Sequence, residues 1–144
     1  MIEEDTIKLL RECDQGIKMG ISSIDQVISY VSSEKMKNVF LKSKMEHSKI
    51  ENEIEEMLSR FQDEGKNPNI FVQGMSKMKT NIELMINDSD YKIASIMVDG
   101  TNMGVKSLSR YLNQYKAASE EAKYITRKII KLEEKLSKDL REFL

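Results

Sequence analysis

The chain's only histidine, His47, is the residue whose type and position are best suited to chemistry. It precedes Glu51 by four residues, and side chains at this spacing share one face of a helix. An imidazole and a carboxylate on one face can hold a metal ion, so a mononuclear site at His47 and Glu51 is one hypothesis. The other is a buried or half-buried histidine that hydrogen-bonds a serine, such as Ser43 one turn before it, or a backbone carbonyl. We favour the second and expect no metal and no other cofactor.

Two pairs of glycines recur with the same spacing in the two halves of the chain. Gly16 and Gly20 are four residues apart, and so are Gly100 and Gly104. A glycine inside a helix costs about 0.5–1 kcal/mol relative to alanine, so four of them need a packing or functional reason. We favour close approach of two helix backbones as that reason. A cleft for a flat ligand is the alternative.

The glycines and the histidine together define a candidate pocket. Counted from an expected turn at residues 32–34, Gly20 lies about as far back along the chain as His47 lies forward, so both should lie at the same height of a bundle. A glycine at that height leaves room beside the imidazole. The sequence therefore predicts a small polar pocket formed by Gly20, Ser43, His47 and Gly104, and it identifies neither the ligand nor any catalytic residue.

Length and composition exclude several classes of protein. The chain has 144 residues, the usual length of one domain, and its 23 basic and 24 acidic side chains give a net charge of −1. This balance provides no basic field for nucleic acid or anionic lipid, and no apolar run approaches the roughly 20 residues of a membrane span. The single cysteine, Cys13, cannot form an internal disulfide, and the acidic N-terminal residues do not resemble a signal peptide. We therefore expect a single cytosolic domain over residues 1–144 that binds neither nucleic acid nor membrane.

Apolar residues recur at alternating steps of three and four, which is typical of helices packed in a bundle. The pattern predicts long helices over residues 4–31, 34–64, 89–117 and 119–143, with Asp5 or Thr6 near the first N-cap. A shorter helix is expected over residues 70–86, after the breaker around Gly65 and Pro68. Short turns join the first long helix to the second and the third to the fourth. The expected fold is therefore an all-α four-helix bundle of two antiparallel hairpins with a helical crossover.

The two hairpins repeat each other in sequence. Met19-Gly20-Ile21-Ser22-Ser23-Ile24 returns as Met103-Gly104-Val105-Lys106-Ser107-Leu108, a shift of 84 residues. Lys49-Ile50-Glu51 matches Lys131-Leu132-Glu133 at a shift of 82 residues. The repeat predicts that the two hairpins are related by a pseudo-twofold axis.

This layout resembles the bacterial ferritin-like four-helix-bundle domains of unknown function. The segments that carry the resemblance are Asp14-Gln15-Gly16 in the first helix and Gly74-Met75-Ser76-Lys77-Met78-Lys79 in the crossover. The resemblance implies a ferritin-like fold and raises the question of a di-iron site, which needs Glu-x-x-His on two helices and a glutamate on each of the others. Lys44 occupies the glutamate position before His47, and Ile129 occupies the position equivalent to His47. We therefore expect no di-iron site.

These observations favour a binding or structural protein over an enzyme, and in particular over an iron oxidase. A degenerate metalloprotein with the mononuclear site at His47 and Glu51 is the alternative. An assembly unit of a homo-oligomer is a third interpretation. The small-molecule ligand, if the protein binds one, is unknown from the sequence.

Overall fold

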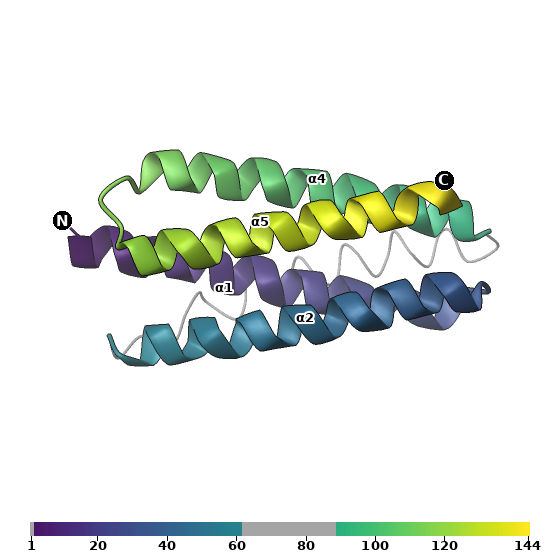
Figure 1. Ribbon diagram of the computed structural model, residues 1–144, viewed down its shortest axis with the longest axis horizontal. Coiled ribbons are helices and arrows are strands. Elements are labelled where there is room, and N and C mark those ends of the chain that lie inside the picture. The colour runs from purple at the N-terminus through teal and green to yellow at the C-terminus, as the bar shows by residue number, and fades with distance from the viewer. Residues whose placement is uncertain (1, 62–88) are drawn as a thin grey trace.

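A computed structural model describes residues 2–61 and 89–144, which form a bundle of four long helices (Figure 1). The helices are α1 (Ile2–Val27), α2 (Glu34–Ser59), α4 (Asp90–Gln114) and α5 (Glu120–Leu140). Two short 3₁₀ helices, η1 (Ile28–Tyr30) and η2 (Arg141–Phe143), follow α1 and α5. Neither described range contains a strand, so the prediction of an all-α four-helix bundle is confirmed. The crossover helix predicted at residues 70–86 lies outside the described residues.

The helices form two antiparallel hairpins, α1 with α2 and α4 with α5, as predicted (Figure 1). Helix α2 ends at one end of the bundle and α4 begins at the other end, so α2 and α4 run in the same direction. No described helix is both long enough and apolar enough to cross a membrane.

Each long helix ends a few residues before its predicted end, α1 begins earlier than predicted, and the predicted first N-cap is wrong. Helix α1 begins at Ile2, so Asp5 and Thr6 lie within the helix and do not cap it. The Thr6 hydroxyl donates to the Ile2 carbonyl at 2.6 Å, as threonines inside helices commonly do. Helix α2 is capped by a serine, since the Ser33 hydroxyl accepts from the Met36 amide at 3.2 Å. The ends of α1 and α5 tighten into 3₁₀ turns, which shortens both α-helices.

Each hairpin turn is hydrogen-bonded to residues near the start of the other hairpin. At the α1–α2 turn, the amides of Ser32 and Ser33 each donate to the Asp90 carboxylate at 2.9 Å, and Asp90 is the first residue of α4. At the α4–α5 turn, the Ser119 amide donates to the Thr6 hydroxyl at 2.8 Å. The Ala117 amide at that turn donates to Asp5 at 3.1 Å. Side chains expected to cap α1 therefore bind the opposite turn, and the two hairpins are tied at both ends of the bundle.

Two apolar clusters fill the bundle, one toward each end. The first contains Leu9, Leu10, Cys13, Ile17, Ile54 and Ile129 among its fully or nearly fully buried members. The second contains Ile24, Val27, Met36, Phe40, Ala94 and Leu140. Between these clusters lies His47, whose side chain is fully buried. The apolar core is therefore interrupted at mid-height by a polar group.

The Asp90 carboxylate should contribute to stability more than an ordinary surface carboxylate does. Replacing Asp90 with alanine removes two hydrogen bonds to a charged group and should lower the free energy of unfolding by about 1–2 kcal/mol. Asp99→Ala on the exposed side of the same helix is the matched control and should change it by less than about 0.5 kcal/mol. Urea unfolding followed by circular dichroism measures both, and equal effects of the two variants would contradict the role given to Asp90.

Candidate functional site

The buried imidazole of His47 forms hydrogen bonds through both ring nitrogens. Nδ1 lies 2.8 Å from the Ser43 carbonyl oxygen and 3.3 Å from the Ser43 hydroxyl. Nε2 lies 2.7 Å from Oε1 of Glu133, which comes from α5. The Glu133 side chain is itself 12% exposed, so the pair is largely shielded from water. The predicted hydrogen bond from His47 to a serine or a backbone carbonyl is present, and the glutamate is an additional partner.

These partners favour the charged form of the imidazole. A carbonyl oxygen and an ionised carboxylate only accept hydrogen bonds, so both ring nitrogens of His47 must donate, and only imidazolium has two N–H groups. Burial by itself lowers the pKa of His47. The hydrogen bond and charge of Glu133, followed by the Ser43 carbonyl and the nearby Glu46, more than offset burial and raise the pKa above its ordinary value of 6.5. The hydrogen-bond geometry and the raised pKa of His47 therefore both favour an ion pair between His47 and Glu133.

Gly20 makes room for this ion pair. A Cβ atom added to Gly20 would lie 2.9 Å from both Cδ2 and Nε2 of His47, closer than carbon atoms can approach without displacement. It would also lie 3.7 Å from Oε1 of Glu133. The prediction that Gly20 lies at the height of His47 and leaves space beside it is confirmed, and the space is filled by the imidazole itself.

A cavity of about 350 Å³ opens beside the pair, between α1 and α4. Most of the side chains that line it are apolar, among them Met19, Met97, Met103, Leu108, Ile129 and Leu136. His47 and Glu133 also line it, reaching it from α2 and α5. All four helices of the described bundle thus contribute to one cavity.

The four helix glycines all line this cavity, and this corrects the close helix approach that we favoured for them. An added Cβ at Gly16 or Gly100 would meet no atom of the described residues within 4 Å. At Gly104 it would approach only the side chain of Glu133, with Cγ and Oε2 at 4.0 Å. The described residues therefore show no close packing at Gly16 or Gly100, and the cavity lies beside both glycines. The arrangement is that of the alternative expectation, a cleft with flat glycine walls.

Glu133 is the residue that the sequence analysis did not assign to the site. The sequence contains an indication of its role, because Glu133 is the repeat equivalent of Glu51, the residue proposed as a partner of His47. Instead, Glu51 lies in the field of Asp14, Glu55 and Lys18; burial, followed by the charge of Glu55, raises its pKa above the ordinary value of 4.5. The described residues contain no group of three or more His, Cys, Asp or Glu side chains placed to hold a metal ion.

Of the predicted pocket residues, the structure brings together Gly20, Ser43, His47 and Gly104. Gly20 contacts His47, Ser43 bonds it, and Gly104 faces Glu133 across the cavity. The mononuclear metal hypothesis for His47 and Glu51 gains no support from the geometry, since both imidazole nitrogens are engaged by other groups.

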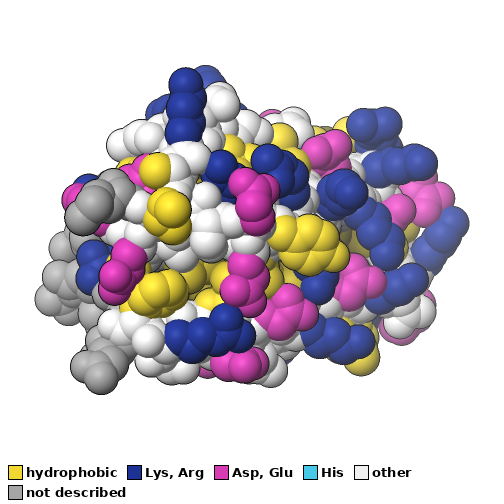
Figure 2. Space-filling view, turned by 60° about the vertical axis from the view of Figure 1, so that its left-hand side comes forward, with side chains coloured by type: hydrophobic (Ala, Val, Ile, Leu, Met, Phe, Trp, Pro, Cys, Tyr) yellow, Lys and Arg dark blue, Asp and Glu magenta, His cyan; other side chains and the backbone are white. Residues whose placement is uncertain are grey.

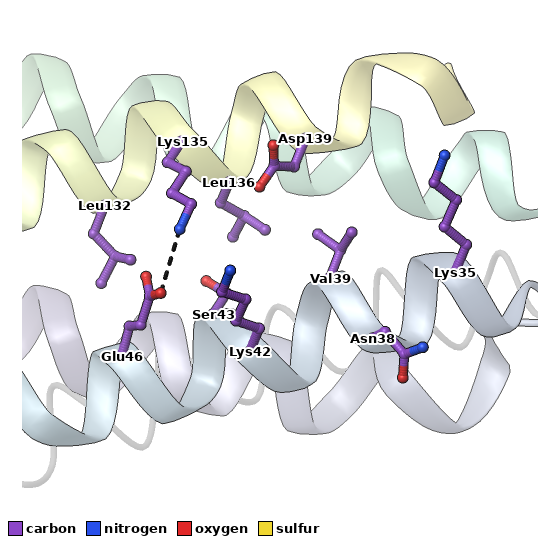
Figure 3. A pocket seen from close by; sticks show the side chains of 10 residues that line it. All are labelled: Lys35, Asn38, Val39, Lys42, Ser43, Glu46, Leu132, Lys135, Leu136 and Asp139. Atoms are coloured by element: carbon purple, nitrogen blue, oxygen red, sulfur yellow. Dashed lines mark hydrogen bonds and ion pairs between the residues drawn. The ribbon is translucent and has the colours of Figure 1, made fainter.

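A second hollow of about 290 Å³ lies between α2 and α5 and is lined mainly by charged side chains (Figure 3). Glu46 points across it to Lys135, with the carboxylate oxygen 3.3 Å from the ammonium nitrogen. Farther along the same helix pair, Lys128 binds Glu53 at 3.1 Å. These pairs join α2 to α5 along the solvent side, so the hollow is a seam of ion pairs rather than a ligand site.

Cys13 is unsuited to nucleophilic chemistry. It is fully buried and lies 3.1 Å from the Thr126 hydroxyl, and burial raises the pKa of its thiol to about 12. The thiolate, which is the reactive form, is therefore absent at neutral pH. Cys13 belongs to the apolar core.

The outer surface carries both signs of charge. Figure 2 shows Lys and Arg side chains interleaved with Asp and Glu, with small apolar areas between them. No imidazole is visible on that face, in keeping with the full burial of His47.

Comparisons with protein-family models, with curated proteins and with solved structures find no match for this chain. The resemblance to ferritin-like domains therefore stays a prediction.

Substitution of Gly20 by alanine should lower the free energy of unfolding, whereas the same substitution of Gly16 should not. Gly20→Ala should lower the free energy of unfolding by about 1–3 kcal/mol, because the new methyl group overlaps an imidazole held at both nitrogens. Gly16→Ala should raise it by about 0.5–1 kcal/mol through better helix propensity alone. Urea unfolding of the two variants distinguishes them, and a Gly20→Ala protein as stable as Gly16→Ala would contradict the tight contact.

The ion pair should make stability depend on pH in a defined direction. Because the pKa of His47 is raised in the folded state, its contribution is complete below the unfolded value of about 6.5 and is lost as the pH rises through the folded value. The free energy of unfolding should therefore decline above about pH 6.5.

The Glu133→Gln variant tests the origin of this decline, since it keeps an acceptor for Nε2 and removes the charge. Its decline above pH 6.5 should be weaker than that of the unchanged protein, while the exposed neighbour variant Glu134→Gln should retain the full decline. Urea unfolding at several pH values measures all three proteins. If the free energy of unfolding of Glu133→Gln declined as steeply as that of the unchanged protein, another titratable group would be the cause of the decline.

Proposed function

We propose that this protein binds a small, flat, largely apolar molecule in the cavity between α1 and α4. The observation that supports the proposal best is the convergence of all four helix glycines on one cavity. Two of them, Gly16 and Gly100, contact no described atom with an added Cβ, so close packing does not account for them. Glycines in helix interiors lower the stability of the fold. A cavity that needs open space beside the helix backbones gives a functional reason for all four.

The lining suits such a ligand. Methionines from α1 and α4 provide soft, adaptable apolar contacts, and glycine backbones form flat walls that admit a ring. Ligand sites in proteins combine this apolar lining with a few fixed polar groups that orient the ligand. Here the fixed polar groups are His47 and Glu133, which are held by each other and by Ser43.

We further propose that the fold is ferritin-like, with two pseudo-symmetric hairpins. The sequence repeat supports this, as do the reciprocal contacts of Asp90 and Thr6 with the opposite turns. The parallel course of α2 and α4 adds support, because ferritin-like bundles have one long crossover. In this proposal the di-iron site is absent and a single ligand cavity lies near mid-height. The cytosolic location and the structural or homo-oligomeric role considered from the sequence stay predictions.

The proposal predicts that a neutral aromatic alcohol, 1-naphthylmethanol, binds in the cavity. Titration into the ¹⁵N-labelled protein should shift the amide signals of Gly16, Gly20, Gly100 and Gly104 in a saturable way. Gly104→Leu, whose side chain projects into the cavity, should abolish these shifts. Asn102→Leu on the exposed face of the same helix should leave them unchanged.

Circular dichroism establishes that both leucine variants fold. Absence of saturable shifts in the unchanged protein, or their persistence in a folded Gly104→Leu protein, would overturn the proposal.

A further inference from the structure

We infer that the cavity selects a cationic ligand, an organic ammonium carried on a flat apolar body. The inference rests on the proposed function and specifies the chemistry of its ligand. It follows from the hydrogen-bonding groups that the protein leaves unused around the cavity.

The first unused group is the second carboxylate oxygen of Glu133. Oε1 accepts the hydrogen bond from His47, whereas Oε2 faces the Gly104 wall, where an added Cβ would lie 4.0 Å away. No described side chain or backbone amide donates to Oε2 in a hydrogen bond. The absence of a side chain at Gly104 thus leaves a carboxylate oxygen open to the cavity.

The second unused group is the side-chain oxygen of Gln15, which also belongs to a residue lining the cavity. Gln15 Oε1 is buried from solvent and accepts no hydrogen bond from any residue that the structure describes. A buried acceptor without a donor is costly, and such groups in native proteins call for an explanation. Because this oxygen is closed to solvent, a ligand that donates hydrogen bonds would satisfy it only after the Gln15 side chain turned toward the cavity.

The imidazole and threonine donors at the cavity are already committed. Both N–H groups of His47 point to Ser43 and Glu133, and the Thr101 hydroxyl donates to the Val98 carbonyl at 2.8 Å. None of the described residues that line the cavity is a lysine or an arginine. The Glu133 carboxylate therefore keeps one open acceptor at the cavity, whereas the His47 imidazolium, the one cationic side chain among the described lining residues, has both of its N–H groups engaged by the protein.

An anionic ligand would lie next to the Glu133 carboxylate and would find no free N–H group of His47 to bind, whereas an ammonium would form a charge-assisted hydrogen bond with the open oxygen of Glu133. A hydrogen bond of this kind is about twice as strong as one between neutral groups. The His47 imidazolium does not reverse this preference, because Nε2 is hydrogen-bonded to the other oxygen of Glu133 and Nδ1 to the Ser43 carbonyl.

Three probes with the same ring system test the inference: 1-naphthylmethylammonium, 1-naphthylmethanol and 1-naphthoate. Titration at pH 7 and low ionic strength, followed by isothermal calorimetry and by the glycine amide signals, should give the tightest binding for the ammonium. Its dissociation constant should be at least about tenfold lower than that of the carboxylate.

Glu133→Gln should weaken ammonium binding by about tenfold and should weaken 1-naphthylmethanol binding by less, so the preference for the ammonium over the alcohol should narrow. The matched control, Glu134→Gln, removes the same charge from the exposed side of α5 and should bind all three probes as the unchanged protein does. The comparison of ammonium with carboxylate in the unchanged protein remains decisive if Glu133→Gln does not fold.

The outcomes separate this inference from the proposed function. Binding of the alcohol or the carboxylate with no preference for the ammonium would overturn the inference and leave the binding function standing. An ammonium affinity unaffected in folded Glu133→Gln would also overturn it. Failure of all three probes to bind would remove the proposed function itself.

Discussion

The buried ion pair of His47 and Glu133 is the constraint around which the centre of the bundle is arranged. Removing two charged groups from water is costly, and a pair of this kind persists only when its remaining hydrogen-bonding capacity is satisfied. The Ser43 carbonyl satisfies Nδ1 of the imidazole, and the absence of a side chain at Gly20 gives the ring its space. The pair also lies between the two apolar clusters, which seal it from both ends of the bundle. Its contribution is to specificity more than to net stability, because an apolar pair could fill the same volume without fixing how α5 slides along α2.

The cavity is a consequence of that arrangement. The glycine of α1 that admits the imidazole belongs to a pair, and its counterpart on α4 leaves the Glu133 carboxylate uncovered. The four glycines of α1 and α4 border the space beside the pair, together with methionines. A packing explanation would require contacts at Gly16 and Gly100 that the described residues do not make. Under the proposed binding function, both the missing contacts and the open carboxylate oxygen are features of the site.

The sequence was sufficient for the fold class, for the two hairpins and for the neighbourhood of His47, but not for its main partner. A tight turn joins α1 to α2, so counting residues from the turn placed Gly20 beside His47 correctly. No short turn joins α2 to α5, and their relative register cannot be counted along the chain. That register becomes visible only in the ladder of antiparallel contacts between the two helices, namely Glu46 with Lys135, His47 with Glu133, Glu53 with Lys128 and Arg60 with Glu121. The predicted N-cap of α1 is wrong for a related reason. Asp5 and Thr6 accept hydrogen bonds from a turn that lies more than a hundred residues away in the chain.

The repeat in the sequence therefore builds one site and not two. Glu51 and Glu133 are equivalent in the repeat, but only Glu133 meets an imidazole, because the position equivalent to His47 in the second hairpin is Ile129. Ile129 nevertheless lines the same cavity as His47, where it forms part of the apolar wall. At these equivalent positions the first hairpin thus provides an imidazole and the second an apolar side chain. This division produces a cavity with a polar end and an apolar side, which is the asymmetry that a ligand with a charged group and a flat hydrocarbon body requires.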